Sequence, residues 1–249
     1  MIDQDRLHQT KFSHVLTEDG VRQAKRLFGI PKKKIPKQTQ QEVYVHQVMD
    51  SFVELQRIVE SLDMAELFLK SYSVSKAWKD RYDQNHYFGY HYEAWIINSI
   101  RLYERLLILI SSVFWLEIKH KDVSYKVIAD HPKLKGTDTL KVLNKVHGAI
   151  SNLQGVKNSV FHRYAYSDPE LDEINKYNFL ARNSEGEKKE QFSRFAKLKM
   201  RLFYLPQKRR EVTNNNMELL KAADAILETL EQPYVKHRDT LEDNSQVRE

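Results

Sequence analysis

The feature that most constrains this sequence is its scarcity of residues that interrupt helices. Only 7 glycines and 6 prolines occur among 249 residues, whereas these two residues together make up about 12% of an average globular protein. A sandwich or barrel of short strands needs many tight turns, which are built largely from glycine and proline. The sequence therefore predicts an all-α fold, a helical bundle long enough to bury a substantial core.

Hydrophobic periodicity places the expected helices. Residues 41–70 carry apolar side chains at heptad spacing, which predicts a long helix that packs lengthwise against another helix. Residues 87–116 are apolar on nearly every face, as is typical of a central helix in a bundle. The string Asp168-Pro169-Glu170 has the cap, proline and acidic residue that begin many helices. Further helices are expected at residues 17–28, 138–154, 191–205 and 212–230.

Two changes in composition suggest how the chain is organised. A lysine-rich stretch bounded by prolines, residues 31–38, predicts a linker, and the charged segment after Pro233 is expected to fray. We therefore expect an N-terminal helix and basic linker over residues 1–38, a helical bundle over residues 39–232, and a charged tail over residues 233–249.

Residue content argues against several kinds of chemistry. The chain has no cysteine, which excludes a disulfide scaffold, a thiolate zinc site and a cysteine nucleophile. Its glycines are too far apart for a phosphate or dinucleotide loop. His86 and His91 are five residues apart and lie roughly 140° apart around a helix, which favours aromatic packing over metal ligation. We expect neither a metal nor a cofactor.

Charge and hydropathy bear on partners and location. The formal net charge of +6 permits contact with nucleic acid without requiring it. Basic residues gather at 32–37 and 197–210, although short runs of this kind are usually solvated linkers or helix ends. The longest apolar stretch, residues 106–116, is too short to span a bilayer, and the polar N-terminus shows no secretory signal. We expect a soluble, cytoplasmic protein that does not enter a membrane.

One short string combines residues suited to proton transfer beside a phosphate. Asn158 and His162 are four residues apart and would share a helix face, where the amide could orient the imidazole. Lys157 and Arg163 bracket them with positive charge, which should lower the pKa of His162 and leave a neutral imidazole near pH 7. This set fits metal-independent RNA cleavage, in which a 2′-hydroxyl attacks the adjacent phosphate, histidine moves protons and cations stabilise the transition state.

The string Lys157-Asn158-x-x-x-His162 resembles the Arg-x(4–6)-His motif of the HEPN superfamily, in which asparagine often follows the arginine. The order of elements also agrees over about residues 87–230, with long helices preceding the motif. The chain is most similar to uncharacterised bacterial HEPN-like proteins with extra long helices. The resemblance implies a core of long antiparallel helices plus an N-terminal helical extension over the first 80 residues. It also implies a homodimer whose two motifs form a ribonuclease site, in a toxin–antitoxin or antiviral defence role.

The string departs from the family motif and has competitors. Lys157 replaces the arginine, and lysine cannot bind phosphate through two parallel N–H groups. Arg163 could supply those two N–H groups instead. Alternatively, the protein has lost catalysis and keeps only dimerisation or RNA binding. The bare pattern recurs at Arg81–His86 and at Lys126–His131. A solvated histidine on a basic surface turn is the structural alternative.

Two functions of other classes stay open. A non-catalytic helical module, binding RNA or a partner protein in the manner of an antitoxin, would use the heptad seams of residues 41–70 and 212–230. A DNA-binding regulator is less well supported, because the apolar helices are much longer than the recognition helix of a helix-turn-helix motif.

Overall fold

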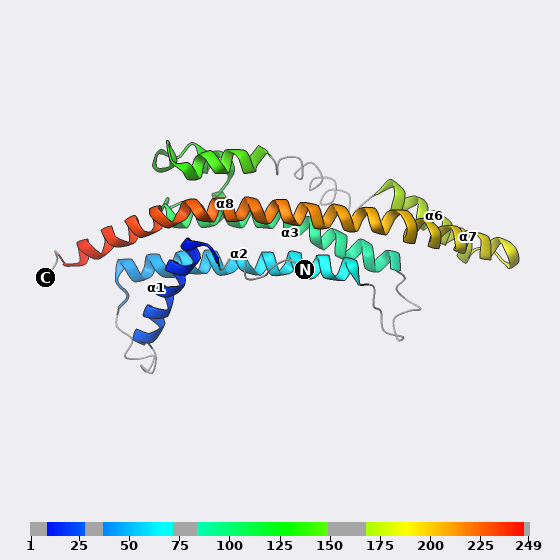
Figure 1. Cartoon of the computed structure of the whole chain (residues 1–249), viewed down its shortest axis with the longest axis horizontal. Coiled ribbons are helices and arrows are strands. Elements are labelled where there is room, and N and C mark those ends of the chain that lie inside the picture. Colours follow the sequence, from blue (N-terminus) through cyan, green and yellow to red (C-terminus); the bar gives the residue numbers. More distant parts are fainter. Residues whose placement is uncertain (1–8, 28–36, 72–83, 149–167, 247–249) are drawn as a thin grey trace. The chain divides into compact units, whose positions relative to one another are not determined.

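A computed structural model describes residues 9–27, 37–71, 84–148 and 168–246. These residues are mostly helical and contain no strand (Figure 1), which confirms the all-α prediction. The longer helices are α1 (Lys11–Leu27), α2 (Gln40–Lys70), α3 (Gln84–Val113), α6 (Pro169–Arg182), α7 (Gly186–Leu198) and α8 (Leu205–Gln246). The shorter elements are α4 (Tyr125–Ala129), two 3-10 turns (His120–Asp122 and Pro132–Leu134) and the π-helical segment η6 (Lys199–Tyr204). Residues 138–148 are also helical.

The described residues form two compact units, each of which is treated by itself. Unit 1 contains residues 61–71, 84–100 and 168–218, and unit 2 contains residues 9–27, 37–60, 101–148 and 219–246. Within these ranges, no helix has an apolar stretch of the length and hydropathy that crossing a bilayer requires.

Aromatic side chains fill the core of unit 2. Phe12 of α1 meets Phe52 of α2 and Tyr234 of α8 edge-on, with ring centroids 5.8 Å apart in both pairs. Tyr44 of α2 stacks on Tyr234 at 5.6 Å, and its hydroxyl donates to the Val113 carbonyl oxygen at 2.7 Å. These buried contacts tie α1, α2, α3 and α8 together within the unit.

The C-terminal helix does not stop where its sequence suggested. Helix α8 continues through Pro233 to Gln246, so the expectation of a frayed segment directly after Pro233 is wrong. Tyr234 is fully buried, and its hydroxyl donates to Asp19 Oδ2 at 2.9 Å. Arg238 donates to the same oxygen at 2.7 Å. Because these bonds reach α1, the charged end of α8 stays helical despite its proline.

Unit 1 is built around a charged network that joins α2, α3 and α8. Glu66 is 4% exposed and accepts hydrogen bonds from Lys70, from Thr213 Oγ1 at 2.8 Å and from Asn216 Nδ2 at 2.7 Å. The Asn216 side-chain oxygen accepts in turn from Trp95 Nε1 at 2.8 Å. Burial raises the pKa of Glu66, but the three donors outweigh it and lower the pKa overall. The carboxylate of Glu66 is therefore ionised, and its hydrogen-bonding capacity is taken up by these three donors.

The predicted heptad seams are confirmed as apolar, but the chain's own helices bury them. The seven seam residues of α2 are each at most 5% exposed, and the corresponding residues of α8 are buried as well. The idea that these two seams hold a partner protein is therefore wrong. The α2 residues are Val45, Val48, Phe52, Leu55, Val59, Leu62 and Leu69, and the α8 residues are Val212, Leu219, Ala223, Ile226 and Leu230.

Candidate nucleic-acid interface

The four residues predicted to form the catalytic site lie outside the described residues. They are Lys157, Asn158, His162 and Arg163. Their roles, and the alternative of a solvated basic turn, therefore stay predictions. Most of the basic run at 32–37 and the arginine of the competing Arg81–His86 string also lie outside the described ranges.

The competing string Lys126–His131 has a structural explanation. His131 precedes a 3-10 turn, and its Nδ1 accepts a hydrogen bond from the Lys133 backbone N–H at 3.3 Å. Accepting this bond requires an unprotonated Nδ1. The imidazole therefore serves as a helix cap, which favours a local structural role over a phosphate site.

The histidines at the start of α3 do not assemble a metal site. His91 contacts the rings of Phe68, Tyr87 and Tyr90, with centroids 4.7, 4.4 and 5.2 Å away. Burial lowers its pKa. The predicted aromatic packing is thus confirmed for His91. The described part of the chain contains no group of three or more histidine, cysteine, aspartate or glutamate side chains that could hold a metal ion.

The helix that follows the predicted motif is firmly anchored. As predicted, Asp168 caps α6, and its Oδ1 accepts from the backbone N–H groups of Glu170 and Leu171 at 2.9 and 3.4 Å. Pro169 occupies the first helical position. The other carboxylate oxygen of Asp168 pairs with Lys208 Nζ of α8 at 3.0 Å. One side chain therefore begins α6 and ties it to α8.

Lys208 is a structural cation. Its side chain is 14% exposed, and its Nζ lies 3.2 Å from Glu211 Oε2 and over the rings of Tyr92 and Tyr204 at 5.2 and 5.8 Å. Burial alone would lower the pKa of Lys208, but Asp168 and the neighbouring negative groups raise it overall. Lys208 is therefore charged and already paired, which leaves it unsuited to bind a phosphate.

The basic run at 197–210 is accordingly divided between structural and surface roles. Lys199 pairs with Glu173 of α6, and Arg209 Nε donates to the Leu69 carbonyl oxygen at 2.7 Å. Lys197 and Arg201 are exposed instead. Residues 186–246 run on as α7, η6 and α8, so the predicted separation into helices 191–205 and 212–230 is wrong.

Helices α6 and α7 lie side by side (Figure 1) and, with η6, line an open groove of about 1030 Å³. Gly186 at the start of α7 has a φ of +58°, a left-handed conformation that glycine adopts without strain. The turn between the two helices thus depends on this residue. The groove lies entirely within unit 1.

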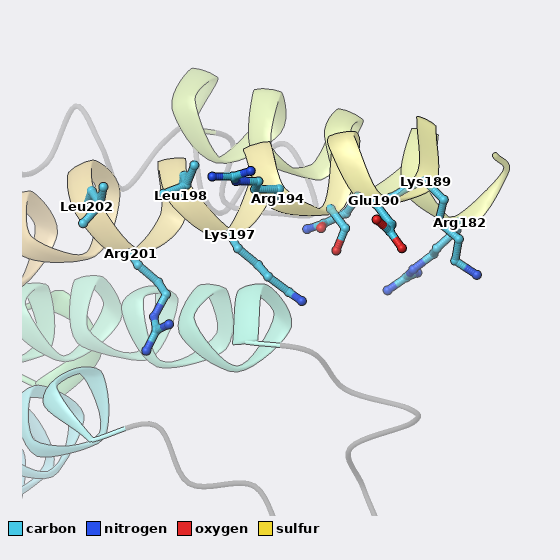
Figure 2. Close-up of a pocket in the computed structure, with 11 residues that line it drawn as sticks. Arg182, Lys189, Glu190, Arg194, Lys197, Leu198, Arg201 and Leu202 are labelled. Atoms are coloured by element: carbon cyan, nitrogen blue, oxygen red, sulfur yellow. The ribbon is translucent and has the colours of Figure 1, made fainter. Parts of the chain in front are cut away.

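The groove is strongly cationic. Its charged lining consists of five basic side chains against one carboxylate, namely Arg182, Lys189, Arg194, Lys197 and Arg201 against Glu190. Figure 2 shows Lys197 and Arg201 extending to one side of the helix, and Leu198 and Leu202 to the other. A concave row of cations with few acidic neighbours is the electrostatic form expected of a site for a polyanion.

Sequence reasoning found only part of this groove. The basic run had pointed to Lys197 and Arg201, but Arg182, Lys189 and Arg194 were not singled out. Arg194, Lys197 and Arg201 are spaced by three and four residues, so they share a helix face. That spacing was the available signal, whereas the contribution of α6 depends on the turn at Gly186.

The fold and the groove together define an all-helical protein with a surface suited to a polyanion. Residues 44–232, which are 189 of the 249 residues, match the HEPN_Cthe2314-like HEPN family. The chain therefore belongs to this HEPN family, which confirms the resemblance drawn from the motif. The match begins within α2, ahead of the 87–230 range expected for the HEPN-like part. No curated protein and no solved structure gives a significant match.

Proposed function

We propose that the protein binds single-stranded RNA along the α6–α7 groove and, as a homodimer, cleaves it without a metal at His162. The observation that carries the proposal is the groove itself, whose five cations face one carboxylate. Two further facts support it. The chain belongs to a HEPN family, and the matched range includes the residues from Lys157 to Arg163.

The proposed chemistry is transfer of the phosphate to the neighbouring hydroxyl. The RNA 2′-oxygen attacks the adjacent phosphorus and loses its proton to the imidazole of His162. The bond from phosphorus to the 5′-oxygen breaks, and the partner's His162, which enters the step as an imidazolium, donates its proton to the departing oxygen, leaving a cyclic phosphate, a 5′-hydroxyl and a neutral imidazole. Lys157 and Arg163 offset the negative charge that develops on the phosphoryl oxygens, and Asn158 orients the imidazole.

The groove contributes affinity rather than chemistry. A cation that neutralises a phosphate releases condensed counterions, so the logarithm of affinity falls linearly with that of salt concentration, by about 0.7 per contact for single strands. Lys197 and Arg201 lie on one side of α7 and η6 and are both exposed. Replacing both with glutamine should therefore reduce the slope by about 1.4 and weaken binding at low salt.

The test separates binding from cleavage. Wild type is compared with His162→Ala, with Lys197→Gln/Arg201→Gln, and with Lys145→Gln/Lys221→Gln as a control that removes two exposed lysines of unit 2. We expect His162→Ala to bind single-stranded RNA as wild type does but not to cleave it. The groove variant should bind more weakly, and the control should match wild type. Equal cleavage by wild type and His162→Ala refutes the enzymatic role, and equal salt slopes refute the groove.

The lysine at position 157 favours one second candidate, a HEPN protein that binds RNA without cutting it. That candidate is supported if the wild-type protein binds RNA through the groove but leaves the RNA intact, both with EDTA and without it. Two further measurements address the biological role. Expression should slow growth in wild type and not in His162→Ala if the protein is a toxin or defence ribonuclease, and sedimentation should show a dimer.

A further inference from the structure

An exposed row of apolar side chains runs along α7 and η6. We call Phe195, Leu198 and Leu202 the apolar stripe; their exposed fractions are 50%, 43% and 61%. Monomeric proteins seldom leave large apolar side chains grouped on one surface, and such groups commonly mark sites of interaction. The three residues are separated by three and then four positions, which is the a–d–a spacing of a heptad seam, although Leu202 lies in the π-helical segment η6.

The same heptad register explains why this seam is open. When Phe195 is position a, Ala196 and Met200 take positions b and f, and both are 2% exposed. The helix therefore packs on the rest of unit 1 through its b and f positions, which leaves positions a and d partly exposed, although the ring of Phe195 also stacks on Tyr177 of α6 at 5.9 Å. Figure 2 shows Leu198 and Leu202 on the same side of the helix. This arrangement is the reverse of α2, whose seam is buried by the chain's own helices.

The residues beside the stripe are basic. Both g positions of this register are arginine, Arg194 and Arg201, whereas Lys199 at the e position between them already pairs with Glu173 of α6. In coiled coils, the side chains at e and g set the choice of partner through charge. A second copy of this chain that docked in the antiparallel orientation would bring arginine against arginine, and like charges there oppose pairing. A helix with acidic flanks would pair with them.

We propose that the apolar stripe docks an acidic amphipathic helix of a partner protein. The apolar seam of the partner helix packs on Phe195, Leu198 and Leu202. Its carboxylates pair with Arg194 and with Arg201, whose exposed side chain has to turn toward the stripe from the position shown in Figure 2. Since these two arginines also line the groove, the docked helix competes with RNA. The competition rests on the proposed function, whereas docking itself does not.

The probe is a synthetic helical peptide of about three heptads, with leucine at a and d and glutamate at e and g. A matched peptide carries lysine at e and g. Binding to the full-length protein is followed by fluorescence anisotropy without RNA. We expect the acidic peptide to bind at least ~10-fold more tightly than the basic one, because each unfavourable charge pair costs affinity. Arg194→Glu/Arg201→Glu should reverse that preference.

Two variants test the apolar contacts. Leu198→Ala/Leu202→Ala should weaken the acidic peptide at least ~10-fold, because the truncation removes two buried anchors. Met217→Ala changes a side chain of α8 that is 45% exposed and lies outside the stripe, so it should bind as wild type. Circular dichroism confirms that each variant is folded. Equal affinity for both peptides, or equal binding by the leucine variant and wild type, overturns the proposal.

Other occupants of the stripe give distinct results. If the wild-type protein is a dimer that does not bind the peptide, and Leu198→Ala/Leu202→Ala is a monomer, the stripe serves self-association and the proposal is overturned. Binding to phosphatidylserine vesicles that this variant loses, again without binding of the peptide, would assign it to a membrane surface and also overturn it. RNA binding measured without peptide tests the proposed function alone, and displacement of bound RNA by the acidic peptide is expected when both hold.

Discussion

Asp168 performs two structural tasks that two substitutions can separate. Its Oδ1 caps α6, and its Oδ2 pairs with Lys208. Asparagine is as good a helix cap as aspartate but carries no charge, whereas alanine does neither task. Asp168→Asn therefore removes the ion pair alone, and Asp168→Ala removes the pair and the cap.

The structure sets the expected magnitudes. Lys208 is 14% exposed, so leaving its charge without Asp168 is costly, but it keeps Glu211 at 3.2 Å and the faces of two tyrosine rings. We therefore expect Asp168→Asn to lower the free energy of opening α6 by about 2 kcal/mol. This is less than the 3–5 kcal/mol typical of a buried charge that loses its only partner. Losing the cap adds about 1 kcal/mol, giving about 3 kcal/mol for Asp168→Ala.

Hydrogen exchange of the α6 amides measures these losses locally, because it reports the free energy of opening that helix rather than of the whole chain. In a Lys208→Met background, Asp168→Asn should cost less than about 0.5 kcal/mol, since the charge partner is gone. Equal protection in wild type and Asp168→Asn would refute the ion pair as a stabilising contact. Equal protection in the asparagine and alanine variants would refute the cap.

Substitutions at three other positions test the two units by urea unfolding. Glu66→Ala should lower the free energy of unfolding by about 2–4 kcal/mol, because the buried amide of Asn216 loses its acceptor. A loss below 1 kcal/mol would show that the network is not stabilising. The pKa of Glu66 is lower in the folded protein than in the unfolded chain, where it is about 4.3. The contribution of Glu66 to stability is therefore complete above the unfolded pKa and is lost as pH falls through the folded pKa. Glu66→Gln should abolish that part of the acid sensitivity, and an unchanged pH profile would contradict it. Tyr234→Phe should cost about 1 kcal/mol through loss of the bond to Asp19, and no change would mean that this bond is replaced by solvent. Pro233→Ala should stabilise the protein by about 1–3 kcal/mol by restoring a helical N–H donor, whereas destabilisation would show that the proline fits its site.

The helices of this protein could be predicted wherever local signals were complete. The heptad pattern predicted residues 41–70, and the structure has α2 at Gln40–Lys70. The Asp168-Pro169 string predicted the start of α6, and both the cap and the proline lie as expected. Caps and periodic apolar residues act within a few positions, so a single sequence displays them in full.

Helix ends that depend on distant contacts were predicted less well. Residues 87–116 were expected to be helical, but α3 ends at Val113 in a pair of capping bonds, from Trp115 N–H to Ser112 and from Leu116 N–H to Ser111. Trp115 adopts a left-handed φ of +47°, a conformation usually reserved for glycine, so its sequence gave no warning. Its ring packs against Tyr44, a contact from another helix.

The candidate interface shows the same division. Counting charges along the sequence identified the basic run at 197–210, but not which of its members are exposed. Lys208 and Arg209 are bound by Asp168 and by the Leu69 carbonyl oxygen, whereas Lys197 and Arg201 reach the groove. The difference is one of burial and partner, which no property of a lysine or arginine in isolation records.

By itself, the sequence determined that this chain is helical and where its main helices lie, because backbone propensity and apolar period are local properties. It also indicated the superfamily to which the chain belongs. Tertiary structure alone decided which apolar seams and which cations remain accessible. The bond from Tyr234 to Asp19 joins residues 215 positions apart and keeps a proline-containing helix intact. Likewise, α7 and η6 have an exposed seam because their opposite face, at Ala196 and Met200, packs on the rest of unit 1. Burial is shared between segments distant in sequence, so it emerges only when the chain has folded.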